Sequence, residues 1–294
     1  MKYLSKKNNF LGIGSKFSSY DNSRIVILPI PYEKTVSYGK GTLLGPLKIL
    51  EASHFVEFYD EEMNRELCFE LGISTLNKLE INNISSKKAL LKIYKKVLKL
   101  LDDGKFVVSL GGEHTISQAP IKAYYERFNN LSILQIDAHS DLRQIYEGNK
   151  YSHACVMARV AEFTKDIHQA GIRAQDIAEA EFIQNNKIKT YYMRDIREGK
   201  HTKNWQKKIA ENLNENVYIT FDVDGFDPAV IPATGTPEPG GLFWDEIMKL
   251  IKLIGKTKNI VGFDVVELAP SKCQKASDFT AAKLVYKMLN YAFQ

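Results

Sequence analysis

Short apolar runs rich in β-branched residues recur along the chain and indicate buried strands. Their apolar character is nearly continuous, whereas a half-exposed strand would alternate between apolar and polar residues. The six runs are Arg24–Pro29, Lys105–Leu110, Leu131–Asp137, Lys189–Met193, Val217–Phe221 and Asn259–Val265. Amphipathic stretches lie between them, such as Ser86–Asp102, where leucines recur at helical spacing and lysines fill the other face.

The alternation of strand and helix over the whole length predicts an α/β fold with a mostly parallel sheet covered on both sides. In such sheets, ligands bind at the carboxyl ends of the strands. The chain has 294 residues, of which 44% are hydrophobic, so one domain over residues 1–294 is expected. The sequence has no internal repeat or linker, and the Gly/Pro-dense stretch Pro228–Gly241 is predicted to be a long active-site loop.

Charge and cysteine content narrow the class of protein. The net charge of +5 comes from 40 Lys and Arg against 35 Asp and Glu, and the lysines are scattered, which argues against nucleic acid as a partner. No apolar run approaches the roughly 20 residues of a membrane span, and the start MKYLSKKNNF lacks a signal-peptide core. Cys68, Cys155 and Cys273 have no CxxC spacing and are expected to be small buried residues in a reducing compartment. A cytoplasmic location without a membrane partner is therefore expected.

Polar clusters follow four of the predicted strands, which is more than a core requires. Asp137, His139 and Asp141 stand at i, i+2 and i+4, so their side chains share one side if the chain stays extended. Groups of this kind repel one another or lose hydration unless a cation lies among them. Asp222 and Asp224 repeat the pattern on another strand. With a histidine after the Gly-Gly turn that ends a third strand, the candidate ligands are His114, Asp137, His139, Asp141, Asp222 and Asp224.

Each of these positions has an ordinary structural explanation when taken alone. His114 could be a hydrogen-bonded turn residue, and Asp137 could cap a helix. Asp222 could begin a calcium loop, but an EF-hand needs glycine at its sixth position, where this chain has Asp227. The coincidence of three strand ends favours joint metal binding. Four carboxylates, two imidazoles and no thiolate favour manganese or magnesium, and six ligands favour two ions, which is equipment for hydrolysis.

Four motifs resemble the signatures of the arginase/agmatinase ureohydrolases and occur in the family's order. They are GGEH at Gly111–His114, DAHSD at Asp137–Asp141, DVDGFDP at Asp222–Pro228 and GTPEPGG at Gly235–Gly241. The similarity extends from Thr35–Pro46 to the VVELAP segment that ends at Pro270. The resemblance implies a three-layer α/β/α arginase-type fold with about eight strands, a homotrimer or homohexamer, and two Mn²⁺ per chain.

The resemblance also assigns roles to the candidate residues. It implies one manganese held by His114, Asp137, Asp141 and Asp222, and another by Asp137, His139, Asp222 and Asp224. Glu267 would pair with the substrate guanidinium, and His153 would carry protons, with Asp141 as a further catalytic group. A surface loop residue at Glu267 and a structural histidine at position 153 are the alternatives. His54, His168 and His201 match no motif and are expected to be ordinary.

The substrate implied by the resemblance is a guanidino-amine such as agmatine, which would give urea and putrescine in polyamine biosynthesis. Arginine-specific relatives carry an asparagine where this chain has Arg143. Glu147 and Glu238 are the candidate partners for the distal ammonium, with solvated loop charges as the alternative. Arginase, guanidinobutyrase and formiminoglutamase activities stay open on the same fold. A single-metal deacetylase and a non-catalytic metal-binding homologue are the rivals from other classes.

Overall fold

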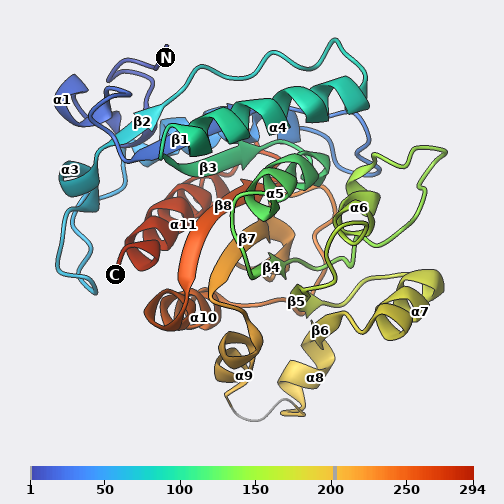
Figure 1. Cartoon of the computed structure of the whole chain (residues 1–294). Coiled ribbons are helices and arrows are strands. Elements are labelled where there is room, and N and C mark those ends of the chain that lie inside the picture. Colours follow the sequence, from blue (N-terminus) through green and yellow to red (C-terminus); the bar gives the residue numbers. More distant parts are fainter. Residues whose placement is uncertain (1, 201–203) are drawn as a thin grey trace.

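The centre of the structure is an eight-stranded sheet in which the described strand pairings are all parallel. The computed structural model describes residues 2–200 and 204–294. The strand order is β2-β1-β3-β8-β7-β4-β5-β6 (Figure 1). The strands are β1 Ile25–Ile30, β2 Ile73–Thr75, β3 Phe106–Gly111, β4 Leu131–Ile136, β5 Ile167–Ile172, β6 Lys189–Tyr192, β7 Asn216–Asp222 and β8 Asn259–Val266.

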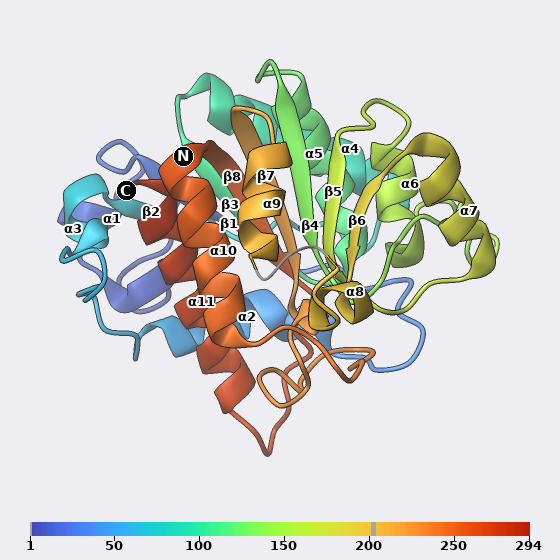
Figure 2. The ribbon, with the colours of Figure 1, turned by 90° about the horizontal axis from the view of Figure 1, so that it is seen from below.

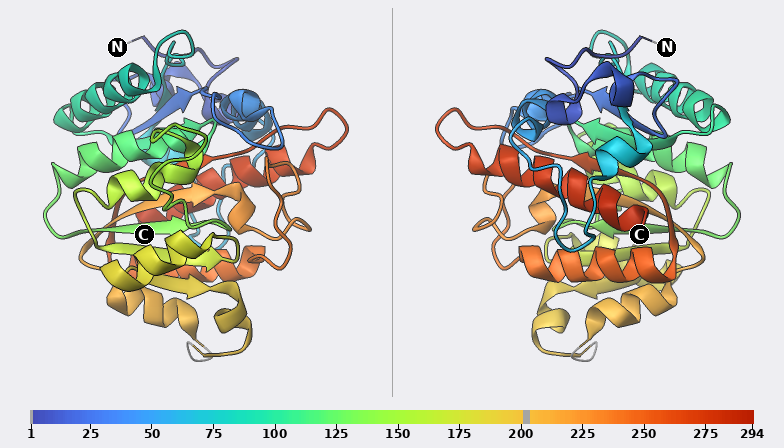
Figure 3. Two further views of the ribbon diagram at one scale, coloured as in Figure 1. Left: turned by 90° about the vertical axis from the view of Figure 1, so that its right-hand side faces the viewer. Right: turned by 90° about the vertical axis from the view of Figure 1, so that its left-hand side faces the viewer.

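Helices cover both faces of the sheet and complete three layers. In Figure 2, α2, α9, α10 and α11 lie on the near side, whereas α4, α5 and α6 lie behind it. Figure 3 shows α10 and α11 side by side. The helices are α1 Ser15–Ser18, α2 Gly45–Ser53, α3 Leu67–Leu71, α4 Ser86–Asp102, α5 Gln118–Tyr125, α6 Val156–Val160, α7 Ile177–Asn186, α8 Met193–Arg197, α9 Trp205–Asn212, α10 Trp244–Thr257 and α11 Ala276–Ala292. Short 3₁₀ turns are η1 Phe10–Gly12, η2 Thr42–Leu44, η3 His114–Ser117, η4 His153–Cys155 and η5 Val223–Gly225.

Two hydrophobic cores fill the spaces between the layers. Neighbouring residues of β7 point to opposite faces, so that Ile219 belongs to the core under α10 and α11, and Tyr218 to the core under α4 and α5. Ile93 and Val97 of α4, one helical turn apart, are fully buried in the second core. Sequence periodicity therefore places α4 correctly, with the predicted bounds Ser86–Asp102.

All six predicted strands are present, and their bounds shift by about one residue. Two further strands escaped prediction because their sequences lack a continuous apolar run. The edge strand β2 has three residues. The interior strand β5 carries His168 and Gln169, both fully buried, and Gly171. Pro228–Gly241 is a loop without a regular strand or helix, as predicted.

The cysteines are free thiols, and one prediction about them is wrong. Cys68 and Cys155 are buried, but Cys273 is exposed in the segment before α11, where no apolar layer covers it. Among the described helices, none is both long and apolar enough to cross a membrane.

Candidate metal centre

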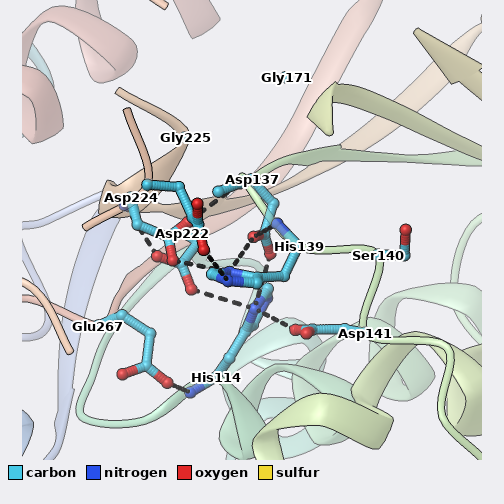
Figure 4. Close-up of polar contacts among 12 residues, drawn as sticks. His114, Asp137, His139, Ser140, Asp141, Gly171, Asp222, Asp224, Gly225 and Glu267 are labelled. Carbon is cyan, nitrogen blue, oxygen red and sulfur yellow. Dashed lines mark hydrogen bonds and ion pairs between the residues drawn. The ribbon is translucent and has the colours of Figure 1, made fainter. Parts of the chain in front are cut away.

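The candidate metal ligands and Glu267 meet because the four strands that carry them are neighbours. β3, β8, β7 and β4 lie side by side in the middle of the sheet, and parallel strands bring their carboxyl ends to one edge. His114 follows β3, Glu267 follows β8, and Asp137 follows β4. Figure 4 shows the side chains of the predicted ligands pointing toward one another, whereas Ser140 points away. The structure thus brings together all six predicted metal ligands and Glu267.

The imidazole of His114 lies among three carboxylates. Its Nδ1 is 3.0 Å from Asp141 Oδ2, 3.1 Å from Asp137 Oδ2 and 3.4 Å from Asp222 Oδ2. This nitrogen is buried and has no hydrogen-bond partner among the described residues. Nε2 lies 2.9 Å from Thr220 Oγ1, so the ring has a partner on its other side. A buried nitrogen surrounded by carboxylate oxygens fits a metal ligand.

A second group of ligand atoms gathers around His139. Its Nδ1 lies 2.9 Å from Asp224 Oδ2 and 3.7 Å from Asp137 Oδ1. The donor atoms form two clusters that share the carboxylate of Asp137. One cluster consists of His114, Asp137 and Asp141, and the other of Asp137, His139 and Asp224. Asp137 directs Oδ2 toward the first imidazole and Oδ1 toward the second. Asp222 lies beside both clusters but belongs to neither of these sets.

Amide side chains support Asp137 from beneath. Nε2 of Gln135 donates to Asp137 Oδ2 at 2.8 Å, and Nε2 of Gln169 donates to Gln135 Oε1 at 2.6 Å. Gly171 and Gly225 lie against the backbone of Asp137, and a Cβ on either would come within 3.0 Å of it. These contacts hold the shared carboxylate between the two clusters.

Crowding of acidic and basic side chains shifts the pKa values of the site residues. Burial lowers the pKa of His139, but the charges of Asp224 and Asp137 outweigh it and raise the pKa to about 12. Burial and the charge of Asp137 raise the pKa of Asp141 to about 7. The same groups therefore compete for protons in a dry space, and a bound cation relieves such competition.

Two of the site residues have a left-handed backbone. φ is +54° at Asp141 and +64° at Glu267, a region that non-glycine residues rarely adopt. The chain therefore does not stay extended through Asp141, which was the condition for placing the three side chains on one side. The carbonyl of Asp141 accepts hydrogen bonds from the backbone N–H groups of Met157 and Ala158, at 2.9 and 3.2 Å, which holds this conformation against α6.

A cavity of about 350 Å³ opens above the ligands. Glu267, His153 and Glu238 line it, together with Arg143. Glu147 is exposed and is not part of this lining. Glu147 has a left-handed backbone and lies in an exposed turn. Its proximity in sequence to the DAHSD motif therefore does not bring its side chain into the cavity lining.

Arg143 does not present a free positive charge to this cavity. Its Nη1 lies 2.9 Å from Asp176 Oδ2, and its Nε lies 3.7 Å from Glu179 Oε2. The guanidinium also lies over the ring of Tyr146, 5.2 Å from the centroid. Two carboxylates therefore offset the charge of Arg143.

Arg173 is a site residue that the motifs did not reveal. Its guanidinium donates to the backbone carbonyls of Asp224 and Phe226, at 2.7 and 3.1 Å, and to that of Glu238 at 2.8 Å. It thus fixes the loop after β7, including the backbone at Glu238, against the end of the sheet. The sequence signal for Arg173 was its position directly after a strand, at the carboxyl edge of the sheet. It could not be used because β5 was not predicted.

The other histidines are placed as expected where they are described. Nε2 of His54 lies 2.8 Å from the carbonyl of Asn9, and Nε2 of His168 lies 2.9 Å from Asp166 Oδ1. His201 lies outside the described residues.

Comparison with known proteins identifies the family. The description "Arginase family" matches residues 23–290. The chain belongs to the arginase family. It is a hydrolase of the arginase/agmatinase ureohydrolase type, as the motifs predicted.

Individual relatives in this family are similar over nearly their whole length. An N(1)-aminopropylagmatine ureohydrolase of Synechocystis sp. is 38% identical, over 99% of this chain and 95% of the relative. An agmatinase of Bacillus anthracis is 35% identical, over 92% of each chain. The crystal structure of agmatine ureohydrolase of Thermoplasma volcanium matches with a TM-score of 0.83 and 29% identity, over 100% of this chain and 94% of that one. The eight-stranded arginase-type α/β fold is thus confirmed.

Proposed function

We propose that this protein is a binuclear manganese ureohydrolase that hydrolyses the guanidinium of agmatine or a related guanidino-amine. The products would be urea and putrescine, or the corresponding polyamine. The observation that carries the proposal is the position of Asp137, whose two oxygens face His114 and His139 in two adjoining ligand clusters. Relatives named agmatinase and N(1)-aminopropylagmatine ureohydrolase support the substrate class.

The metal assignment follows the family pattern and the chemistry of the donors. His114, Asp137, Asp141 and Asp222 would hold one ion, and Asp137, His139, Asp222 and Asp224 the other. Four carboxylates and two imidazoles suit manganese. When bound, two such ions supply an activated water as nucleophile and stabilise the negative charge that develops during attack. The unpartnered Nδ1 of His114 supports this assignment.

Glu267 would bind the guanidinium. Its Oε1 accepts a hydrogen bond from the backbone N–H of His114 at 2.5 Å, which orients the carboxylate. Its Oε2 has no hydrogen bond to any described residue, and the side chain lines the cavity. A carboxylate held in this way can pair with a guanidinium through charge-assisted hydrogen bonds. The central carbon of the substrate would then lie above the metal ligands.

Asp141 and His153 would handle the protons. Asp141, a member of the first cluster, would accept a hydrogen bond from the attacking water and orient it. His153 lines the cavity, and burial, its largest influence, lowers its pKa. A neutral imidazole near the leaving group can relay a proton from solvent to the departing amine. Collapse of the tetrahedral intermediate would release the amine and urea.

Selectivity for an amine tail rests on the charges at the cavity wall. Glu238 lines the cavity with its side chain 39% exposed, and Arg173 fixes its backbone. Among the described residues that line this cavity, Arg143 is the one arginine or lysine, and Asp176 and Glu179 offset its charge. An ammonium group is therefore favoured over the α-carboxylate of arginine. Glu147 stays a sequence-based prediction for the same role.

The test is urea release from agmatine by the manganese-reconstituted protein, with chelator-treated protein and Glu267→Gln as controls. We expect activity in the reconstituted wild type only. A protein that binds manganese but releases urea from no guanidino compound would instead support the non-catalytic homologue. Preference for arginine, guanidinobutyrate or formiminoglutamate would retain the ureohydrolase reaction and reject the amine substrate.

A further inference from the structure

Glu113, the acidic residue of the GGEH motif, contributes to neither ligand cluster, yet it is fully buried. Its carboxylate is instead an acceptor for four donors. The backbone N–H groups of Lys34 and Thr35 donate to Oε2 at 2.6 and 2.7 Å. The hydroxyls of Thr35 and Thr115 donate to Oε1 at 2.8 and 2.7 Å. A side chain with so many partners fixes the segment at Thr35 with respect to the site.

Thr35 in turn contacts His153 at two points. The backbone N–H of His153 donates to Thr35 Oγ1 at 3.1 Å, and Nδ1 of His153 lies 3.3 Å from the same oxygen. A hydroxyl has one proton to donate. The short bond to the Glu113 carboxylate takes that proton, since hydrogen bonds to ionised acceptors are stronger than those to neutral ones. Toward Nδ1, Thr35 Oγ1 is therefore an acceptor, and Nδ1 must carry the proton.

From these contacts we infer that Glu113 and Thr35 are positioning residues that hold His153 in its Nδ1–H tautomer. The lone pair of neutral His153 is then on Nε2, which has no hydrogen bond to any residue that the structure describes. His153 lines the cavity. The carboxylate of Glu113, acting through the hydroxyl of Thr35, thus determines which nitrogen of His153 can exchange protons. This inference rests on the proposed role of His153 in the ureohydrolase reaction.

A second hydroxyl near Nδ1 does not decide the tautomer by itself. Ser152 Oγ also lies 3.3 Å from Nδ1 of His153. A serine hydroxyl with no carboxylate attached can donate or accept, so it adapts to either tautomer. Only Thr35 has its proton committed elsewhere. Removal of the Thr35 hydroxyl should therefore change the tautomer of His153, whereas removal of the Ser152 hydroxyl should not.

The direct test is NMR of the full-length, magnesium-loaded protein labelled with ¹³C and ¹⁵N in histidine, since magnesium is diamagnetic. At about pH 8.5, two units above the ordinary histidine pKa, the imidazole is neutral. The ¹³Cδ2 shift then reports the tautomer, and His153→Asn assigns the signal. We expect Nδ1–H in the wild type and a change toward Nε2–H in Thr35→Val. An Nε2–H tautomer in the wild type would overturn the inference without any variant.

Kinetics provide the second readout. Thr35→Val should lower kcat about tenfold or more and leave KM and metal content unchanged. This loss of kcat is smaller than the ~10²- to 10⁴-fold loss expected when the acid-base group itself is removed. Thr35→Ser should recover most of the wild-type kcat. The matched control is Thr115→Val, which removes a similar bond to the same carboxylate without contact to His153 and should keep kcat near the wild-type value.

The outcomes separate this inference from the proposed function. A loss of kcat in Ser152→Ala but not in Thr35→Val would assign the tautomer to Ser152 and reject the role of Glu113. An equal loss in Thr35→Val and Thr115→Val would show a structural effect and also reject it. A wild type that releases no urea from any guanidino compound contradicts the proposed function, and the NMR measurement on the same protein still decides the tautomer.

Discussion

A single hydroxyl joins His114 to Asp264. Nε2 of His114 and Oδ1 of Asp264 lie 2.9 and 2.8 Å from Thr220 Oγ1. Asp264 is fully buried and also accepts hydrogen bonds from Ser117 and Tyr218, at 2.9 and 2.8 Å. Because Thr220 donates its proton to this carboxylate, it accepts one from Nε2 of His114. The lone pair of His114 is then on Nδ1, among the carboxylates of the site.

Thr220→Val should therefore weaken metal binding. Removal of an outer partner of a metal-bound histidine costs about 10- to 100-fold in metal affinity or activity. Manganese titration followed by activity or calorimetry measures the effect, and Thr220→Ser should restore it. Wild-type affinity in Thr220→Val, with the protein folded, would show that the ring orientation does not depend on this hydroxyl.

Asp137→Asn and Asp224→Asn should differ in metal content. Asp137 faces both imidazoles, so its loss should reduce both manganese sites, whereas Asp224 belongs to one cluster and its loss should reduce one. Metal analysis after reconstitution and desalting counts the ions per chain. Asp102→Asn, at an exposed helix end, is the matched control and should keep two. One zinc per wild-type chain, unaffected by Asp137→Asn, would contradict the binuclear assignment.

His153→Asn should lower kcat by roughly 10²- to 10⁴-fold, the usual range for a general acid-base group, with metal content unchanged. His54→Asn is the matched control because its imidazole contacts the Asn9 carbonyl and matches no motif. Steady-state urea release and metal analysis on the same samples measure both quantities. If turnover and metal content fall together, His153 is a ligand or a structural residue.

Glu238→Gln should raise KM for agmatine by roughly three- to tenfold, since a partly exposed ion pair contributes about 1 kcal/mol. KM for 4-guanidinobutyrate should change less or fall. Glu238 Oε1 also lies 3.9 Å from Nε2 of His139, so metal content must be measured in parallel. Glu147→Gln distinguishes the two glutamates: a larger rise in KM there would transfer the ammonium contact to Glu147.

Much of the fold was predictable because central strands in a covered parallel sheet have continuous apolar runs. β5 was missed for a physical reason: His168 and Gln169 are buried polar residues that interrupt the apolar run, and Gln135, the partner of Gln169, lies 34 residues away in the sequence. The metal ligands were predictable because they cluster at strand ends. The contact from Glu113 to Thr35 spans 78 residues, so no local pattern could reveal it.

The backbone also limited what spacing could predict. The shared side expected for Asp137, His139 and Asp141 assumed an extended segment, but φ of Asp141 is +54°, and its side chain reaches His114 from a left-handed backbone. Glu147 follows the same motif closely and yet lies outside the cavity lining, whereas Glu238, nearly a hundred residues farther along, lies within it. Turn conformation, which depends on contacts with other segments, decides such cases.

The central claim, hydrolysis of a guanidino-amine, is tested most directly by comparing kcat/KM for urea release from four compounds under the same manganese conditions. The compounds are agmatine, N1-aminopropylagmatine, 4-guanidinobutyrate and arginine. The charges around Glu238 and Arg143 predict that kcat/KM for agmatine or N1-aminopropylagmatine is at least about tenfold higher than for 4-guanidinobutyrate and arginine. This ratio is equivalent to ~1.4 kcal/mol of transition-state stabilisation. A tenfold advantage for arginine or 4-guanidinobutyrate would contradict the account.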